Sequence, residues 1–198
     1  MDPVTGGAVT GEDWYARELV GAHFTGVSFV DVDMTELHDE GSTFEDCRFA
    51  GVRFNASVHT DAAFTGCTFT RCSFFDARLV RCKTVGSTFE RCTFDALVVE
   101  GGSWGFVSLR SADLRGARLT GVRLREADLT GARCEGGVIR DGDLSGALLD
   151  GADLTCCDLR GTDLGGIRPS TVTLRGAIVT IAQAVTVAEA LGLDVRVD

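Results

Sequence analysis

The chain has 198 residues, with 29 acidic residues against 19 basic ones and a formal net charge of −10 at pH 7. This length allows one or two domains, and the acidic balance argues against binding to nucleic acid. Residues 1–21 lack the basic start and apolar run of a secretory signal, and the most apolar stretch, residues 177–193, is too short to span a bilayer comfortably. We therefore expect a cytoplasmic protein that contacts no membrane.

Residues 1–21 precede a long internal repeat and are expected to form an N-terminal cap. The end of a repeat structure exposes unpaired strands, so it needs a cover. Thr10 is a candidate N-cap for a short helix that would continue to Tyr15, and Trp14 would plug the end of the core.

From Phe24 to Leu174, every fifth residue belongs to one column, and 27 of its 31 positions are apolar. Phenylalanine dominates the first part of this column and leucine the last part. An internal repeat this strict determines the architecture before any other argument. We place the repeat domain at residues 22–178, with no linker to divide it.

A second column, two positions before the first, holds small residues such as Ala22, Cys47 and Ala112. Residues two apart on an extended segment point to the same side, so both columns face inward and the residue between them faces outward. The other two residues turn a corner, and the second is often glycine, which tolerates the positive φ of tight turns. This pattern predicts an all-β solenoid, although the period alone leaves three or four edges per coil open.

Units such as Ala-Asp-Leu-Arg-Gly at residues 112–116 resemble those of the pentapeptide-repeat family. The resemblance implies a right-handed quadrilateral β-helix in which about twenty residues close one coil. We expect this fold, with a short α-helix at its C-terminal end.

Four positions break the apolar column, namely Asp39, His59, Thr84 and Pro169. With twenty residues per coil, Asp39 and His59 fall on the same face of successive coils. A carboxylate beside an imidazole is how catalytic pairs are built, but no serine or cysteine nucleophile, phosphate loop or zinc motif accompanies this pair. We interpret the two groups as a local distortion in which each satisfies the other, and we expect no enzyme activity, no metal and no cofactor.

The eight cysteines fit the repeat better than a disulfide framework. Six lie in the small inward column and one, Cys134, lies in the apolar column, so they behave as small buried hydrophobes. No CxxC pair is present, and the adjacent Cys156 and Cys157 are expected to point to opposite faces. We interpret them as structural thiols of a reducing compartment. The inward cysteines are Cys47, Cys67, Cys72, Cys82, Cys92 and Cys157.

Residues 179–198 are expected to form a helix and tail that close the solenoid and mediate dimerisation. Thr180 and Gln183 fit a capping box, and Gly192 is placed to end the helix. Apolar surface at Ala182 and Val187 exceeds what one capping face needs, which suggests a second copy of the chain as partner. The expected interface residues are Ile181, Ala184, Val185, Ala188 and Leu191.

Charge is distributed unevenly, because residues 1–70 carry net −9, residues 71–140 net +4 and residues 141–198 net −5. The aspartates of the last region form a regular lattice at outward and corner positions. Such an acidic rod repels nucleic acid and attracts basic grooves, including grooves that normally hold DNA. The alternative is that the charge only keeps the solenoid soluble. The candidate partner-binding acids are Asp141, Asp143, Asp150, Asp153, Asp158 and Asp163.

A basic belt in the middle of the chain departs from a simple DNA mimic. The stacking of coils would place Arg123 beside Asp143, and Arg133 between Asp113 and Asp153. Part of the belt is therefore expected to form ladders of exposed ion pairs, each contributing about 0–1 kcal/mol. The belt consists of Arg110, Arg115, Arg118, Arg123 and Arg125.

Over roughly residues 22–193, the chain resembles the gyrase-interacting branch of pentapeptide-repeat proteins, particularly the loop-free mycobacterial fluoroquinolone-resistance type. The unbroken register, the change from phenylalanine to leucine, the interruptions at Leu37-His38 and His59, and the C-terminal helix carry this resemblance. It implies a homodimer joined through that helix, an acidic rod resembling B-form DNA, and binding to DNA gyrase in place of DNA. The alternative is a scaffolding solenoid for other proteins, because a fold does not fix a function.

Overall fold

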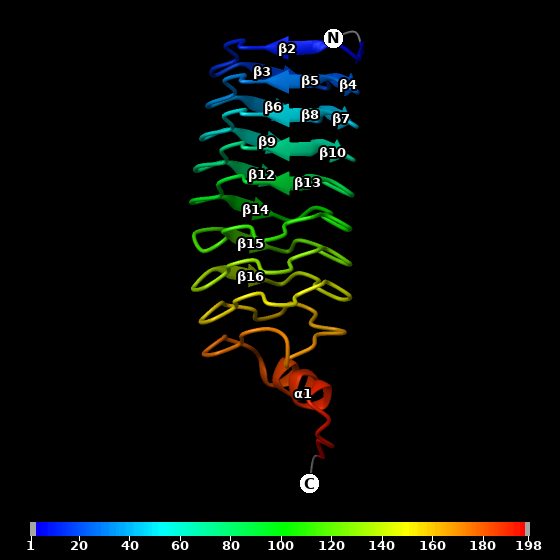
Figure 1. The fold of residues 1–198 in the computed structure, drawn as a ribbon, viewed down its shortest axis with the longest axis vertical. Helices are drawn as coiled ribbons and strands as arrows, with labels where there is room; N and C mark the ends of the chain where they lie inside the picture. Colours follow the sequence, from blue (N-terminus) through cyan, green and yellow to red (C-terminus); the bar gives the residue numbers. More distant parts are fainter. Residues whose placement is uncertain (1–2, 197–198) are drawn as a thin grey trace.

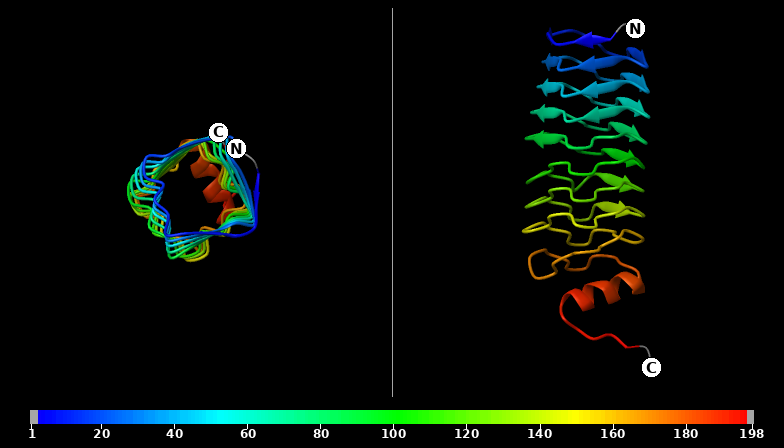
Figure 2. Two further views of the ribbon diagram at one scale, coloured as in Figure 1. Left: turned by 90° about the horizontal axis from the view of Figure 1, so that it is seen from above. Right: turned by 90° about the vertical axis from the view of Figure 1, so that its right-hand side faces the viewer.

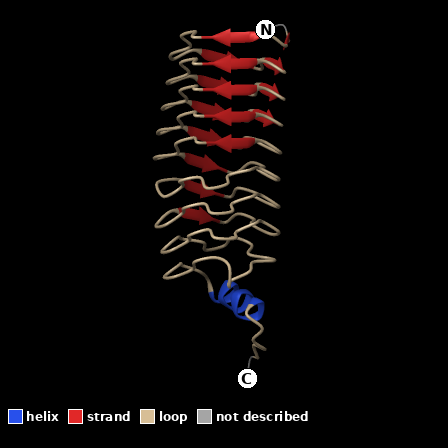
Figure 3. Cartoon of the chain, in the orientation of Figure 1, coloured by secondary structure: helices blue, strands red, loops and turns tan. Residues whose placement is uncertain are grey.

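The computed structural model describes residues 3–196 as a rod of stacked coils closed by one helix, α1 (Ile181–Ala190) (Figures 1 and 3). Neighbouring strands are parallel, and each residue pairs with the one 20 positions later, as Phe24 pairs with Phe44. Seen along the rod, the coils superpose in a four-sided outline (Figure 2). The expected parallel β-solenoid is confirmed, and four edges close each coil.

Three of the four sides carry sheets. Face A is a four-stranded sheet of β1 (Val4–Thr5), β4 (His23–Thr25), β7 (Thr43–Glu45) and β10 (Ala63–Thr65). Face B is a five-stranded sheet of β2 (Ala8–Thr10), β5 (Ser28–Val30), β8 (Arg48–Ala50), β11 (Thr68–Thr70) and β13 (Thr88–Glu90). Face D is a seven-stranded sheet of β3 (Glu18–Val20), β6 (His38–Glu40), β9 (Val58–Thr60), β12 (Arg78–Val80), β14 (Val98–Glu100), β15 (Arg118–Thr120) and β16 (Val138–Arg140). Face C lies between faces B and D and is joined by isolated bridges such as Asp33 to Arg53.

Aromatic rings fill the first part of the core in ladders that run along the rod. On face B, Phe49 stacks between Phe29 and Phe69, with ring centroids 4.9 and 4.7 Å apart. This spacing follows from the separation of about 4.8 Å between neighbouring strands. Rings on adjacent faces meet edge-on, as Phe44 meets Phe49 at an interplanar angle of 65°. Both arrangements are favourable for aromatic pairs, so the column of phenylalanines packs without gaps.

The corners place one residue of almost every unit in the left-handed region, and that residue is not always glycine. Gly41 has φ of 69°, while Asp31 and Phe106 have φ of 52° and 57°. Hydrogen bonds between coils hold such residues in place, since the Asp31 N–H donates to the Ala50 carbonyl over 2.8 Å. The corner therefore tolerates side chains more widely than the sequence analysis assumed.

Within the segment 1–21, where a separate N-terminal cap was expected, residues 4–20 form a further coil. Strands β1, β2 and β3 pair with β4, β5 and β6, and the segment from Thr10 to Tyr15 forms no helix. The reason is that Val4, Val9, Trp14 and Leu19 already continue the apolar column in register. Trp14 does cover the aromatic core, because its ring lies 5.6 Å from that of Phe29.

The cysteines lie where the repeat places them. Cys156 is exposed and its neighbour Cys157 is buried, as expected for opposite faces. Burial raises the pKa of the Cys82 and Cys157 thiols to about 12. These two thiols are therefore protonated side chains of the core.

Candidate functional site

The six candidate aspartates lie around the C-terminal part of the rod on different sides of it. Asp143 and Asp163 are stacked in successive coils on face A, where they follow Arg123. Asp153 continues face C, and Asp158 continues face D beyond Val138. Asp141 and Asp150 occupy corners, and the left-handed φ of 54° at Asp141 is typical of that position. The acids therefore form a collar around the rod rather than one stripe.

The outward aspartates also build the corners that follow them. Asp143 accepts a hydrogen bond from the Ser145 N–H over 2.9 Å, and Asp153 accepts one from the Thr155 N–H over 2.8 Å. Asp163 accepts the Gly165 N–H over 2.8 Å in the same way. A side chain that bonds the backbone two residues on stabilises a turn. Part of the acidic pattern is therefore explained by folding alone.

Hydrogen bonds keep two of these carboxylates ionised. The Thr155 hydroxyl and N–H hold the pKa of Asp153 below its usual range. Partial burial raises the pKa of Asp143, but hydrogen bonds from Ser145 and the charges of Arg125 and Arg123 outweigh it and leave a lowered pKa. Both side chains are anions at neutral pH.

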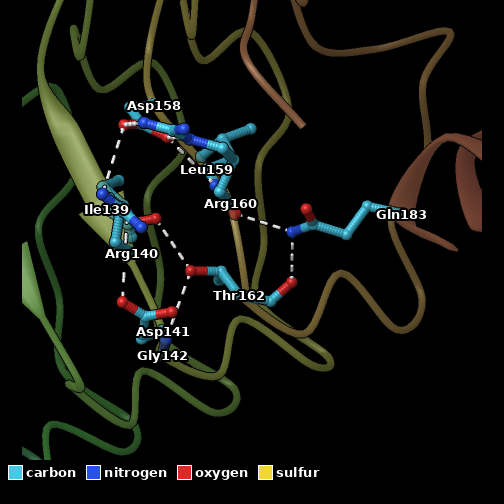
Figure 4. Close-up of polar contacts among 9 residues, drawn as sticks. All are labelled: Ile139, Arg140, Asp141, Gly142, Asp158, Leu159, Arg160, Thr162 and Gln183. Atoms are coloured by element: carbon cyan, nitrogen blue, oxygen red, sulfur yellow. Dashed lines mark hydrogen bonds and ion pairs between the residues drawn. The ribbon is translucent and has the colours of Figure 1, made fainter. Parts of the chain in front are cut away.

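Arginines neutralise several of the other acids. Figure 4 shows Arg160 donating to Asp158 over 2.8 Å, with Arg140 at 3.9 Å from both Asp158 and Asp141. The Arg160 hydrogen bond is the main reason that the pKa of Asp158 falls to about 2. Asp150 is paired with Arg168. Within residues 3–196, Asp153 and Asp163 have no cationic side chain within 4.0 Å, so they are the most available acids.

The basic belt forms the expected ladders in part. Arg133 lies 3.5 Å from Asp113, and Arg125 lies 3.7 Å from Asp143 in the next coil. Other pairs bridge a corner or a neighbouring column, such as Arg115 with Asp113 at 2.6 Å and Arg110 with Asp128 at 2.9 Å. In the described part of the chain, Arg118 and Arg123 have no carboxylate oxygen within 4.0 Å.

Helix α1 docks on the last coil through Gln183, a contact that the sequence analysis did not assign. The Gln183 amide donates to the carbonyl oxygens of Leu159 and Thr162 over 2.6 and 2.7 Å (Figure 4). Its oxygen accepts the Thr180 N–H over 2.8 Å, which completes the predicted capping box. Beside it, Val187 packs against the core, bordering a hollow of about 200 Å³. In the sequence, the signal for this role was a single amide side chain within an otherwise mostly apolar helix.

The residues expected at a dimer interface remain uncovered. Ile181 is 88% exposed and Leu191 is 58% exposed, because the docking side of α1 is formed by Gln183 and Val187. Ala184 is exposed, while Val185 and Ala188 are half-buried. Ile178 and Leu193 extend this apolar surface at the end of the rod.

Asp39 and His59 meet as predicted, and a serine joins them. His59 Nδ1 lies 3.0 Å from Asp39 on the next strand, and His59 Nε2 lies 3.2 Å from Ser57 Oγ. The sequence prediction named no serine nucleophile beside this pair, and it did not assign the contact of Ser57 with His59. Ser57 is a member of the small inward column, which was the available signal.

The Ser57–His59–Asp39 group has the connectivity of a hydrolase triad but lacks its access. The three side chains are at most 3% exposed. Ser57 Oγ donates its proton to the Phe54 carbonyl over 2.8 Å, so that proton does not point at the imidazole. The arrangement satisfies buried polar groups inside the aromatic core.

Among residues 3–196, no group of three or more histidine, cysteine or acidic side chains is arranged to hold a metal ion. The one described helix has 10 residues and is too short to cross a bilayer.

A four-sided parallel solenoid with a five-residue period defines the class of pentapeptide-repeat proteins. The sequence matches the family profile described as pentapeptide repeats, with 8 copies over residues 108–146 and 138–168. The pentapeptide repeat protein MfpA of Mycobacterium tuberculosis (strain ATCC 25618 / H37Rv) is 38% identical over 105 residues, which are 53% of this chain and 57% of MfpA. The chain thus matches little more than half the length of that relative. Residues 108–168 therefore match pentapeptide repeats in sequence, and the described chain continues the same five-residue repeat as a four-sided parallel solenoid.

Solved structures support the same architecture over almost the whole chain. A trypsin-treated form of QnrB1, described as a plasmid-mediated fluoroquinolone resistance protein, gives a TM-score of 0.84 at 20% identity, covering 98% of this chain and 99% of that one. Full-length QnrB1 gives a TM-score of 0.59 at 18% identity, covering 97% and 99% of the two chains. At these identities the likeness concerns the fold.

Proposed function

We propose that this protein binds DNA gyrase as a DNA mimic and modulates or protects the enzyme against quinolones or topoisomerase toxins. The observation that carries the proposal is the acidic collar, whose most available members, Asp153 and Asp163, project from a rigid coil. Among the candidate acids, Asp143 and Asp163 are stacked on face A, about 4.8 Å apart along the rod, so this face carries spaced negative charge. A duplex presents its phosphates in a comparable way.

The exposed side of α1 supports a homodimer. A second copy placed against Ile181, Val185 and Leu191 would cover apolar side chains that the monomer leaves in water. Joining two rods end to end would double the acidic length, as the resemblance to gyrase-interacting relatives implies. Because gyrase acts on chromosomal DNA, the proposal includes a cytoplasmic location for this protein.

Supercoiling and quinolone-stabilised cleavage by purified gyrase test the function. We expect the protein to inhibit supercoiling or relieve cleavage without binding DNA, and the effect to weaken as salt rises, because exposed charges are screened beyond about 8 Å at physiological ionic strength. Replacing Asp143, Asp153 and Asp163 together with asparagine should weaken binding. Asparagine retains the oxygen that accepts the corner N–H, so the coil should stay intact. If the wild-type protein leaves gyrase unaffected at low salt, the scaffolding alternative is favoured.

A variant in α1 tests the dimer separately. Val185→Glu places a charge at a half-buried position of the apolar helix α1. It should give a folded monomer in light scattering, because a desolvated unpaired charge opposes association. Glu189→Gln, at an exposed position of the same helix, is the matched control and should remain dimeric. An unchanged Val185→Glu dimer would place the interface elsewhere.

A further inference from the structure

A hollow of about 230 Å³ opens on the outside of face A in the middle of the rod. Face A continues there through bridges that join Lys83, Ser103, Arg123 and Asp143 in successive coils. Ser103 and Gly105 have little or no side chain, so they leave a gap between the coil before them and the coil after them. The lining consists of Val85, Ser103, Gly105, Phe106, Arg123 and Arg125, with Glu126 at the margin.

Phe106 is the unusual member of this lining. Its side chain is 61% exposed, and its backbone is left-handed with φ of 57°. A bulky residue at positive φ is uncommon, and the same corner in the two preceding coils is occupied by Gly66 and Gly86. Because Phe106 is not part of the buried core, its exposed ring is available for contacts outside the core.

The charges beside Phe106 are basic and incompletely paired. Within residues 3–196, the side-chain nitrogens of Arg123 have no carboxylate oxygen within 4.0 Å. The same holds for Lys83, which lies outside the lining and pairs with Ser103 on the same face. The Arg125 side chain is 66% exposed, and its Nε lies 3.7 Å from the Asp143 carboxylate. Glu126 is the one acid of the lining and lies next to Phe106 in the chain. The hollow therefore combines an apolar wall with a basic margin in an otherwise acidic protein.

We propose that this hollow binds an acidic segment of a partner protein, with an apolar side chain packed on Phe106 and carboxylates on Arg123 and Arg125. The extent of the basic region favours a peptide over nucleic acid. Asp143 and Asp163 follow Arg123 on the same face, so a polyanionic strand leaving the hollow along the rod would meet repulsion. This surface is distinct from the acidic collar and opposite to it in charge, and it does not depend on gyrase binding.

An array of surface-bound peptides tests the proposal with the full-length protein as the labelled probe. In three sets of peptides, glutamate alternates with phenylalanine, with leucine or with alanine. In a fourth set, the charge control, lysine alternates with phenylalanine. We expect binding at low salt to glutamate peptides with phenylalanine or leucine, weaker binding with alanine, and none to the lysine peptides. Equal binding to the alanine and phenylalanine peptides, or no binding to either, would overturn the proposal.

Three variants connect the binding to this hollow. Phe106→Gly should weaken peptide binding about tenfold, since aromatic anchors dominate such interfaces, and it should fold because glycine occupies this corner elsewhere. Gly105→Leu should also weaken binding, because the leucine side chain would fill the hollow. The variant should fold, since a Cβ at this position would lie 3.5 Å from the Arg125 carbonyl oxygen, without a clash. Arg123→Ser, which copies Ser103 of the preceding coil, should reduce the salt dependence of binding.

The controls identify the occupant. Phe75→Asn changes another exposed phenylalanine, 55% exposed, and should leave peptide binding unchanged. Loss of binding in Phe75→Asn as large as in Phe106→Gly would overturn the assignment to the hollow. Two outcomes would assign the hollow to another partner. If a single-stranded oligonucleotide binds through Phe106 more tightly than the glutamate–phenylalanine peptide, the partner is nucleic acid. If Phe106→Gly abolishes self-association, the partner is a second copy of this chain.

Discussion

The front of the rod, residues 24–94, and the back, residues 104–174, share one register but are filled differently. Stacked phenylalanines fill the front, with strands on faces A, B and D. Leucines fill the back, where strands remain only on face D and the other faces continue as isolated bridges such as Asp128 to Leu148. Yet the backbone hydrogen bonds between coils persist. The Leu124 N–H donates to the Asp143 carbonyl over 2.7 Å, much as the Phe54 N–H donates to the Ser73 carbonyl over 2.8 Å. The hydrogen bonds between coils therefore determine the shape of the coil in both halves, and the residue type of the core affects only how stable each half is.

The largest difference between the halves should appear in core truncations. Phe49→Ala and Leu124→Ala both remove side chains with no exposed surface. We expect Phe49→Ala to lower the free energy of unfolding by about 3–5 kcal/mol and Leu124→Ala by about 2–5 kcal/mol, with the former larger. The excess comes from two stacked neighbours of Phe49, each pair worth about 0.5–1.5 kcal/mol. Urea denaturation measures both, and an equal or larger loss for Leu124→Ala would show that stacking adds nothing.

The polar interruption of the front core should also be costly to break. His59→Leu restores the apolar column but leaves the buried Asp39 carboxylate without its 3.0 Å partner. We expect a loss of about 3–5 kcal/mol in unfolding free energy, as for other buried pairs that lose one member. Replacing Asp39 and His59 together with leucine should recover most of that loss, because no buried charge remains. A single variant as stable as the wild-type protein in urea would contradict this account.

The attachment of the helix to the back should depend on one amide. Gln183→Ala leaves the Leu159 and Thr162 carbonyls without their donor, which we expect to cost about 1–3 kcal/mol. Hydrogen exchange should show faster opening of α1 while the coils of the front stay protected. Glu189→Ala, exposed on the same helix, serves as control. Unchanged exchange in Gln183→Ala would mean that Val187 alone holds the helix.

The smallest effect should be the same in both halves. The Arg53 hydrogen bond lowers the pKa of Asp33 in the front to about 2, and the Arg160 hydrogen bond lowers that of Asp158 in the back to about 2. An unfolded aspartate has a pKa of about 3.9, so each pair stabilises fully above about pH 4 and is lost as the pH falls through 2. Because the arginines are exposed, we expect less than about 1 kcal/mol per pair. Asp33→Asn and Asp158→Asn should flatten the acid dependence equally in thermal unfolding, and a clear inequality would show that the halves differ electrostatically.

Predictions from the sequence succeeded where a residue's role follows from its place in the repeat. The contact of Asp39 with His59 required only the coil length, and the helix start at Thr180 required only local capping chemistry. The prediction failed at the N-terminal end, where Val4 to Leu19 form a coil rather than a cap. Predictions were incomplete where a second side chain completes a site, as Ser57 does for His59 and Arg160 for Asp158.

The sequence by itself determined the register of this protein, which side chains face inward, and which residues become neighbours in successive coils. These properties follow from the two-residue alternation of extended backbone and the constant length of each unit. Only the tertiary structure decided which aspartates are neutralised, which side of α1 docks, and that Phe106 stands exposed beside an open hollow. Those outcomes depend on where long side chains reach across corners and coils, and on the space that small neighbours leave, which a periodic pattern does not specify.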